Sequence, residues 1–189
     1  MTTATAYLSG IARVFEKVEV TGRGGAPYSL DAGIDAAVEL VLSLSKGGKA
    51  LLIGNGGSAG IVSHMHNDLC KAVRVRAMVL TETPLLTALA NDDGYETAFH
   101  TQVRLWAEPG DLLIAVSSSG ESNNIITAAT EAAARGCRLL TMTGFKPGNR
   151  LRQLGDVNVY VPDNGYGYVE MTHSVLGHCI TDTAVSRRA

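Results

Sequence analysis

The chain has 189 residues, of which 46% are hydrophobic and 18% are charged, and its formal net charge is −2 at pH 7. This length and composition suit a folded domain with a sizeable buried core, and they exclude a disordered or fibrous chain. The near balance of 16 basic and 18 acidic residues gives no electrostatic reason to expect nucleic acid or an anionic membrane as the main partner.

The first part of the chain is expected to form two helices. Apolar residues such as Leu8, Ile11 and Phe15 recur at helical spacing within residues 1–20. The glycine-rich stretch 20–27 is expected to be a flexible break. A second helix is predicted from residue 29 or 31 to residue 45, where Gly47 and Gly48 stop it. Residues 1–48 thus form an N-terminal helical extension, a position that often serves as an oligomer interface.

An alternating pattern follows this extension. Short apolar runs occur at 50–53, 77–80, 112–116, 139–143 and 157–161, separated by helical patterns at 58–72, 84–91, 96–107, 122–135, 148–154 and 168–185. Short apolar strands between helices indicate a parallel sheet covered on both faces. We therefore predict an α/β chain with a three-layer αβα core at 49–185. Its doubly wound sheet has five parallel strands, within a single domain spanning 1–189.

Two loops follow strands of this sheet and begin helices. The glycine loop, residues 54–60, reads Gly-Asn-Gly-Gly-Ser-Ala-Gly, and the serine loop, residues 117–124, reads Ser-Ser-Ser-Gly-Glu-Ser-Asn-Asn. Ligands of open parallel sheets bind beyond the carboxyl ends of the strands, where backbone N–H groups and the helix dipole favour an anion. Four serine hydroxyls add uncharged donors, which suit a phosphate monoester bound without a metal or a lysine.

Other interpretations of these loops remain open. Each loop alone is equally compatible with a tight turn that caps a helix. The glycine loop also matches a relaxed dinucleotide fingerprint, Gly54-x-Gly56-x-x-Ala59, with Glu82 where a ribose-binding acid would sit. This match would indicate a nicotinamide-dependent enzyme as an alternative. The serine loop would have no role in such an enzyme.

Candidate acid–base groups follow the glycine loop and recur in the last helix. His64 and Asp68 are four residues apart and share a helix face, and Glu170 and His178, eight apart, point to broadly the same side. A carboxylate and an imidazole over a bound sugar permit proton transfer between adjacent carbons through an enediol. The same groups have the donor types for a zinc-like divalent ion. An isolated histidine such as His173 is more typical of hydrogen-bonded scaffolding.

These motifs resemble those of the phosphoheptose isomerases, members of the sugar isomerase (SIS) domain superfamily, over residues 29–183. The resemblance rests on residues 54–58, 90–92, 117–122 and 170–178. It implies that the sugar phosphate is bound by Ser117, Ser118, Ser119 and Ser122. The further substrate-binding residues that it implies are Asn55, Gly56, Gly57, Ser58, Asp92 and Glu170.

The resemblance also implies a metal and a reaction. His64, Asp68, Glu170 and His178 match the zinc-ligand set of the family, with one Zn²⁺ or similar divalent cation per active site. Asp68 and His178 correspond to the catalytic, proton-transferring pair. The implied activity converts sedoheptulose 7-phosphate to a D-glycero-D-manno-heptose 7-phosphate for nucleotide-activated heptose. The implied assembly is a homotetramer with active sites between subunits.

Four positions depart from the family pattern. Asp68 replaces a common Glu and Glu170 a common Gln, and both changes preserve the chemistry. Ala72 replaces an Arg and Gly167 an acidic substrate contact, so another ketose phosphate is an alternative substrate. The alternative of a different class is a non-catalytic SIS protein, either a sugar-phosphate sensor or a partner of the DNA-replication initiator.

The location of the protein is predicted from its cysteines and its leader region. Cys70, Cys137 and Cys179 are widely spaced and form no CxxC pair, which argues against disulfides and predicts reduced thiols. Charged residues such as Arg13 and Lys17 interrupt the first twenty positions, so no signal peptide is expected. We therefore expect a cytoplasmic protein.

Overall fold

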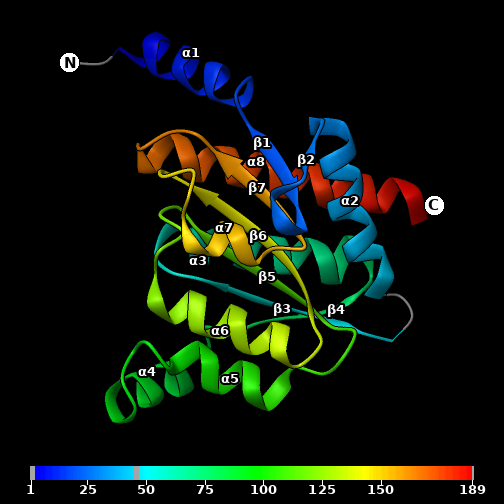
Figure 1. The fold of residues 1–189 in the computed structure, drawn as a ribbon, viewed down its shortest axis with the longest axis vertical. Helices are drawn as coiled ribbons and strands as arrows, with labels where there is room; N and C mark the ends of the chain where they lie inside the picture. The colour runs from blue at the N-terminus through cyan, green and yellow to red at the C-terminus, as the bar shows by residue number, and fades with distance from the viewer. Residues whose placement is uncertain (1–2, 45–46, 189) are drawn as a thin grey trace.

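The computed structural model describes residues 3–44 and 47–188, and its centre is one twisted sheet. Five strands are parallel, as predicted: β3 (Lys49–Gly54), β4 (Arg76–Val79), β5 (Leu112–Ser117), β6 (Arg138–Gly144) and β7 (Val157–Val161). The full strand order is β2-β1-β7-β6-β5-β3-β4. Figure 1 shows helices on both sides of this sheet, which gives the predicted three layers.

Two short strands extend the sheet beyond the prediction. β1 (Glu19–Gly22) pairs antiparallel with β7, and β2 (Pro27–Tyr28) pairs antiparallel with β1. The prediction of a flexible break at 20–27 was therefore wrong, and the first helix, α1 (Ala4–Phe15), is shorter than expected. A four-residue strand carries too little periodicity to be recognised alone. Its partner is the edge of β7, whose main-chain groups would otherwise be unpaired.

The helices divide between the two faces of the sheet. One face carries α2 (Leu30–Ser43), α3 (Gly57–Asp68) with its π-helical continuation η3 (Leu69–Val73), and α8 (Tyr166–Arg188). The other carries α4 (Thr83–Asp92), α5 (Ala98–Trp106), α6 (Asn123–Ala134) and α7 (Arg150–Leu154). The Ser29 hydroxyl caps α2, as expected, by accepting from the Ala32 amide at 3.3 Å. The predicted end of this helix, residue 45, lies outside the described residues.

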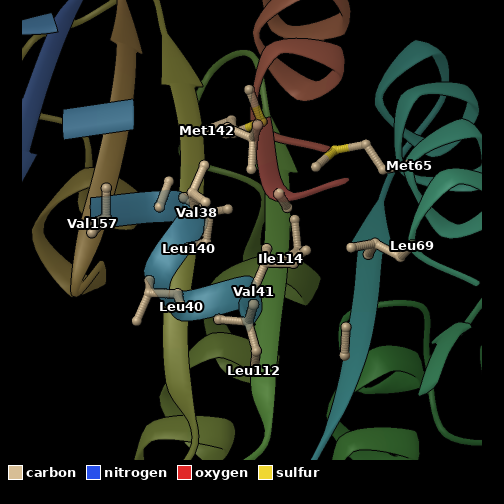
Figure 2. Close-up of a cluster of buried hydrophobic side chains, with 14 of the residues drawn as sticks. Val38, Leu40, Val41, Met65, Leu69, Leu112, Ile114, Leu140, Met142 and Val157 are labelled. Atoms are coloured by element: carbon tan, nitrogen blue, oxygen red, sulfur yellow. The ribbon is translucent and has the colours of Figure 1, made fainter. Parts of the chain in front are cut away.

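Strict alternation along the parallel strands supplies the two halves of the core. Leu52, Ile114 and Met142 face α2, α3 and α8, whereas their neighbours Leu51 and Leu113 face the opposite layer. Figure 2 shows the first half, in which side chains of α2 lie over those of β5, β6 and β7. Each fully buried aliphatic side chain contributes about 1.5–3 kcal/mol, so both faces of the sheet are stabilised by a covering layer of helices.

The helix α1 projects past the edge of the sheet (Figure 1) and meets the start of α8. The rings of Tyr7 and Tyr168 stack with their centroids 4.9 Å apart. Two glycines permit this approach, since a side chain at Gly10 would collide with Tyr168 and one at Gly167 would collide with the Tyr7 hydroxyl. The contact places α1 beside the first turn of α8, which lines the candidate site.

A buried histidine joins α8 to the sheet. His173 is fully buried, and its Nε2 lies 3.0 Å from the carbonyl oxygen of Thr143 on β6. Burial lowers the pKa of His173 to about 4, so the imidazole is neutral at physiological pH. This is the scaffolding role that the sequence favoured for His173. None of the described helices is both long and apolar enough to cross a membrane.

Replacing Gly33 by alanine is expected to destabilise the fold, although alanine is the better helix former. A Cβ on Gly33 would collide with Val20 of β1, because α2 lies directly on that strand. We expect Gly33→Ala to cost about 1–3 kcal/mol, the usual range for overpacking. Urea denaturation of the variant and the parent measures this difference.

The matched control is Gly60→Ala. Gly60 is also the fourth residue of its helix, and nothing lies within 4 Å of the position of its missing Cβ. Helix propensity alone then predicts a gain of roughly 0.5–1 kcal/mol. Equal effects of the two substitutions would contradict the packing of α2 on β1.

His173 makes stability depend on pH in a defined window. The folded-state pKa of about 4 is below the unfolded value of about 6.5, so the unfolded chain binds the extra proton between these values. The contribution of His173 to the free energy of unfolding is therefore complete above pH 6.5. It falls as the pH drops toward 4, by up to about 1.4 kcal/mol per pH unit. Denaturation curves at pH 5 and pH 7 should show a smaller pH difference for His173→Gln than for the parent. An unchanged difference would place the imidazole in solvent.

Candidate functional site

The glycine loop can turn sharply from β3 into α3 because three of its positions are glycine, one for its backbone conformation and two for lack of space. Gly56 has φ 53° and ψ −124°, a conformation that other residues rarely adopt. A Cβ on Gly54 would lie 2.7 Å from the carbonyl carbon of Ser58, and one on Gly57 would collide with the carboxylate of Glu170. The loop therefore brings the N-terminus of α3 close to α8.

The serine loop makes the corresponding turn from β5 into α6. Ser117 and Ser118 are buried, with 5% exposure each. The Ser117 hydroxyl accepts from the Gly120 amide at 3.2 Å and lies 3.4 Å from the Ser122 hydroxyl. The hydroxyl of Ser118 is buried and has no hydrogen-bond partner. Buried polar groups are normally paired, so this hydroxyl suits a bound ligand.

One pocket of about 250 Å³ joins the two loops. Its polar lining consists of residues from the glycine loop, the serine loop and the first turns of α8: Asn55, Gly56, Gly57, Ser58, Ser117, Ser118, Ser119, Ser122, Tyr166 and Glu170. Every substrate-binding residue suggested by the sequence lies here except Asp92. Asp92 is exposed at the end of α4, where it accepts from the Asn91 side chain at 2.8 Å.

The start of α7 supports the serine loop from outside. The Arg150 guanidinium donates to Glu121 at 2.6 Å, and the Arg150 amide donates to the same carboxylate at 2.9 Å. These hydrogen bonds from Arg150 lower the pKa of Glu121. The Leu151 amide also donates to the Gly120 carbonyl at 3.0 Å. The negative charge of Glu121 is thus paired, which would weaken its repulsion toward an anion in the loop.

A pair of side-chain amides connects the two loops. Asn55 and Asn124 each donate to the other's carbonyl oxygen at 2.9 Å, and Tyr95 donates to the Asn55 carbonyl oxygen at 2.7 Å. Sequence reasoning assigned no role to Asn124 or Tyr95. Asn124 belongs to the serine-loop motif, so the sequence could have indicated a role for it. Tyr95 lies in the connection between α4 and α5, where no sequence motif points to it.

The candidate acid–base groups converge farther along α3 and α8. The Asp68 carboxylate is 3.3 Å from His178 Nδ1 and 3.7 Å from His64 Nε2, with side-chain exposures of 19%, 45% and 58% respectively. The imidazoles meet edge to face, with centroids 4.7 Å apart. Asp68 therefore contacts two imidazoles at a partly exposed surface.

The same three residues fit a divalent metal. One donor atom from each of His64, Asp68 and His178 lies within 4.8 Å of the other two. Two imidazoles and a carboxylate form a typical catalytic zinc set, which leaves a position open for substrate or water. Glu170, the fourth ligand suggested by the sequence, does not join this cluster. Its carboxylate lies against Gly57 in the pocket.

The pocket and the cluster are connected by two helices that run side by side. Glu170 of α8 meets Gly57 of α3, and farther on Gly177 meets Met65, 3.1 Å from the position of a Cβ on Gly177. The seven residues from Gly57 to His64 correspond to about 10 Å along the helix. Within one subunit, the serine-lined pocket and the acid–base cluster are therefore separate ends of one α3–α8 surface.

Comparison with known proteins places the chain in a family. Residues 7–144 match the SIS domain family. The phosphoheptose isomerase of Aliarcobacter butzleri is 35% identical over 181 residues, which cover 93% of this chain and 89% of that protein. That of Shewanella denitrificans is 35% identical over 166 residues, covering 83% and 85%.

Solved structures agree with the sequence relatives. The phosphoheptose isomerase from Neisseria gonorrhoeae has a TM-score of 0.83 and 30% identity, covering 96% of both chains. The sugar-bound Vibrio vulnificus NanR protein, at 17% identity with 97% of this chain and 61% of that chain covered, has a TM-score of 0.69 and shares the fold. With its serine-lined pocket and its carboxylate between two imidazoles, this chain belongs to the phosphoheptose isomerase family of SIS-domain proteins and is a sugar-phosphate isomerase.

Proposed function

We propose that the protein converts sedoheptulose 7-phosphate to D-glycero-D-manno-heptose 7-phosphate, in the cytoplasm, for nucleotide-activated heptose synthesis. The observation that carries this proposal is the Asp68 carboxylate, 3.3 Å from His178 Nδ1. Asp68 and His178 lie on α3 and α8, the two helices whose first turns line the serine-lined pocket. A phosphate site and a proton-transfer pair on one surface are the two parts that a phosphosugar isomerase requires.

The phosphate end of the substrate occupies the serine-lined pocket in this proposal. Ser117, Ser118, Ser119 and Ser122 provide hydroxyl donors, and the amides at the N-terminus of α6 add their dipole. The unpaired hydroxyl of Ser118 supports this assignment, because a phosphate oxygen would satisfy it. Asn55 and Ser58 hold sugar hydroxyls nearby. Asp92, which is outside the pocket of its own subunit, stays a predicted contact.

The carbonyl end of the substrate meets Asp68 and His178. One of the pair removes a proton from C1 of the ketose while the C2 carbonyl oxygen gains one, which gives the enediol. The O1 hydroxyl then loses its proton to form the new C1 carbonyl, and C2 receives a proton. No net proton is consumed. The contact between Asp68 and His178 allows either group to restore the protonation state of the other.

His64, Asp68 and His178 are the residues that would hold Zn²⁺ or a similar divalent ion. A bound divalent ion polarises the substrate carbonyl and stabilises the negative charge of the enediolate. Glu170 remains a predicted fourth ligand, although its carboxylate lies at the glycine loop in this structure.

The proposed active form is a homotetramer with active sites between subunits. Met171 and Val175 are 49% and 47% exposed, and they lie four residues apart on α8. His178 follows three residues later on the same helix face. Exposed apolar side chains that lie together on a helix are candidates for a subunit contact. A neighbouring subunit at this surface would enclose the half-open cluster.

Another ketose phosphate is the alternative substrate. The Tyr7 hydroxyl fills the space next to Gly167, so an acidic contact at position 167 has no room in this chain. Ala72 in η3 has no charge to replace the family's arginine. These two positions alter contacts to the sugar and leave the phosphate pocket and the acid–base pair intact.

Substitution of the acid–base pair should remove turnover without removing binding. We expect Asp68→Asn and His178→Ala each to lower kcat about 10²- to 10⁴-fold, the usual contribution of a positioned acid or base. Exchange of the C1 proton with deuterated solvent, followed by NMR across C5 to C8 ketose phosphates, measures this loss. Asp182→Asn, on the exposed side of α8, is the control. Unchanged turnover in both variants would contradict the assignment of this acid–base pair, and a parent protein that binds these sugars without turning them over would favour a non-catalytic sugar-phosphate sensor.

The metal is tested separately from activity. Elemental analysis should find about one divalent ion per subunit in the purified protein, and His64→Ala should lose it because two protein donors bind such an ion weakly. A chelator should lower kcat of the parent. Sub-stoichiometric metal together with full activity in chelator would exclude a metal from this site.

A further inference from the structure

The side chain of Asn55 has almost all of its hydrogen-bonding capacity occupied by protein. A carboxamide offers two acceptor lone pairs and two N–H donors. The Asn55 oxygen accepts from Asn124 Nδ2 at 2.9 Å and from the Tyr95 hydroxyl at 2.7 Å. Its nitrogen donates to Asn124 Oδ1 at 2.9 Å. One N–H of Asn55, which lines the serine pocket, is the only capacity left for a ligand.

The orientation of both amides is determined by a backbone group. Asn124 Oδ1 also accepts from the Ile125 amide at 3.0 Å, and a backbone amide can only donate. The atom of Asn124 next to the Ile125 amide is therefore the oxygen, and the Asn124 nitrogen is the atom that donates to the Asn55 oxygen. Asn124 is 4% exposed, so water does not compete for these groups. If the Asn55 amide were turned so that its oxygen and nitrogen exchanged places, its nitrogen would face the nitrogen of Asn124 and both hydrogen bonds between the two amides would be lost.

Tyr95 completes this arrangement from a distant part of the chain. It follows α4, and its ring lies 6.4 Å from that of Phe99 on α5 while its hydroxyl reaches Asn55. The hydroxyl occupies the second lone pair of the Asn55 oxygen, which would otherwise be available to a sugar O–H. Removing it would let Asn55 act as an acceptor as well as a donor.

We propose that Tyr95 is a positioning residue which, with Asn124, makes Asn55 a single N–H donor toward the bound sugar. The sugar oxygen opposite Asn55 must then act as an acceptor in the bound state. The inference rests on the proposed ketose-phosphate substrate and adds a specificity element to that site. Tyr95 acts through Asn55 and has no part in the proton transfer.

Tyr95→Phe tests the proposal because it keeps the ring and removes only the hydroxyl. We expect the Kd and the KM for sedoheptulose 7-phosphate to rise about 2- to 12-fold, the equivalent of one neutral hydrogen bond. kcat should change less than KM. The Kd for inorganic phosphate, which needs only the serine loop, should not change. Tyr28→Phe, at the exposed edge strand β2, is the matched control.

Side-chain amide NMR gives a readout that a purely structural role would not produce. In the parent, one of the two Asn55 Nδ2 protons should shift when sedoheptulose 7-phosphate binds, while the proton bonded to Asn124 stays. Equal sugar affinity in Tyr95→Phe and the parent would overturn the proposal, as would parallel losses of sugar and phosphate affinity. A parent protein that binds the sugar without isomerising it would contradict only the proposed function.

Discussion

The structure depends on the convergence of two helix N-termini at the carboxyl edge of the parallel sheet. α3 and α6 both begin there, after β3 and β5, and one pocket is lined by Gly57 and Ser58 of α3 and by Ser122, the N-cap of α6. The dipoles of both helices favour an anion at these ends. The approach requires glycine at positions 56 and 57 of the first loop and at 120 of the second, where φ is 64° and Asn149 occupies the space of a Cβ. An unpaired serine hydroxyl, kept inside this edge, is available to hydrogen-bond a ligand.

In the proposed mechanism the acid–base groups lie on the helix pair α3–α8, whose placement follows from the core. Alternating residues of β5 and β6 bury one face of these helices, and the buried, neutral His173 bonds α8 to β6. Their opposite faces carry the Asp68 carboxylate and its two imidazoles. Because both helices start at the edge where the pocket lies, the proposed substrate, with its phosphate in that pocket, would lie along the surface that bears the acid–base groups. In the proposed homotetramer, the exposed apolar side of α8 would meet a second subunit next to the same groups.

Sequence patterns predicted the parts of the molecule that are local. The predicted strand at 157–161 coincides with β7, and the short apolar runs located the other four parallel strands to within one residue at each end. β1 and β2 were missed because β1 is stabilised by pairing with β7, more than a hundred residues away, and β2 is stabilised by pairing with β1. The position of Glu170 at Gly57 and the contact of Tyr95 with Asn55 are likewise non-local. Helical spacing placed His64 and Asp68 on one face correctly but could not say which turn of α8 would meet them.

A crystal structure of the protein with bound sedoheptulose 7-phosphate tests the central claim most directly. We predict that the phosphate binds to Ser117, Ser118, Ser119 and Ser122, with the Ser118 hydroxyl donating to a phosphate oxygen. It also predicts C1 and C2 of the sugar within hydrogen-bond reach of an Asp68–His178 pair, from the same or a neighbouring subunit. A phosphate bound elsewhere, or a carbonyl end remote from every such pair in the assembly, would contradict it.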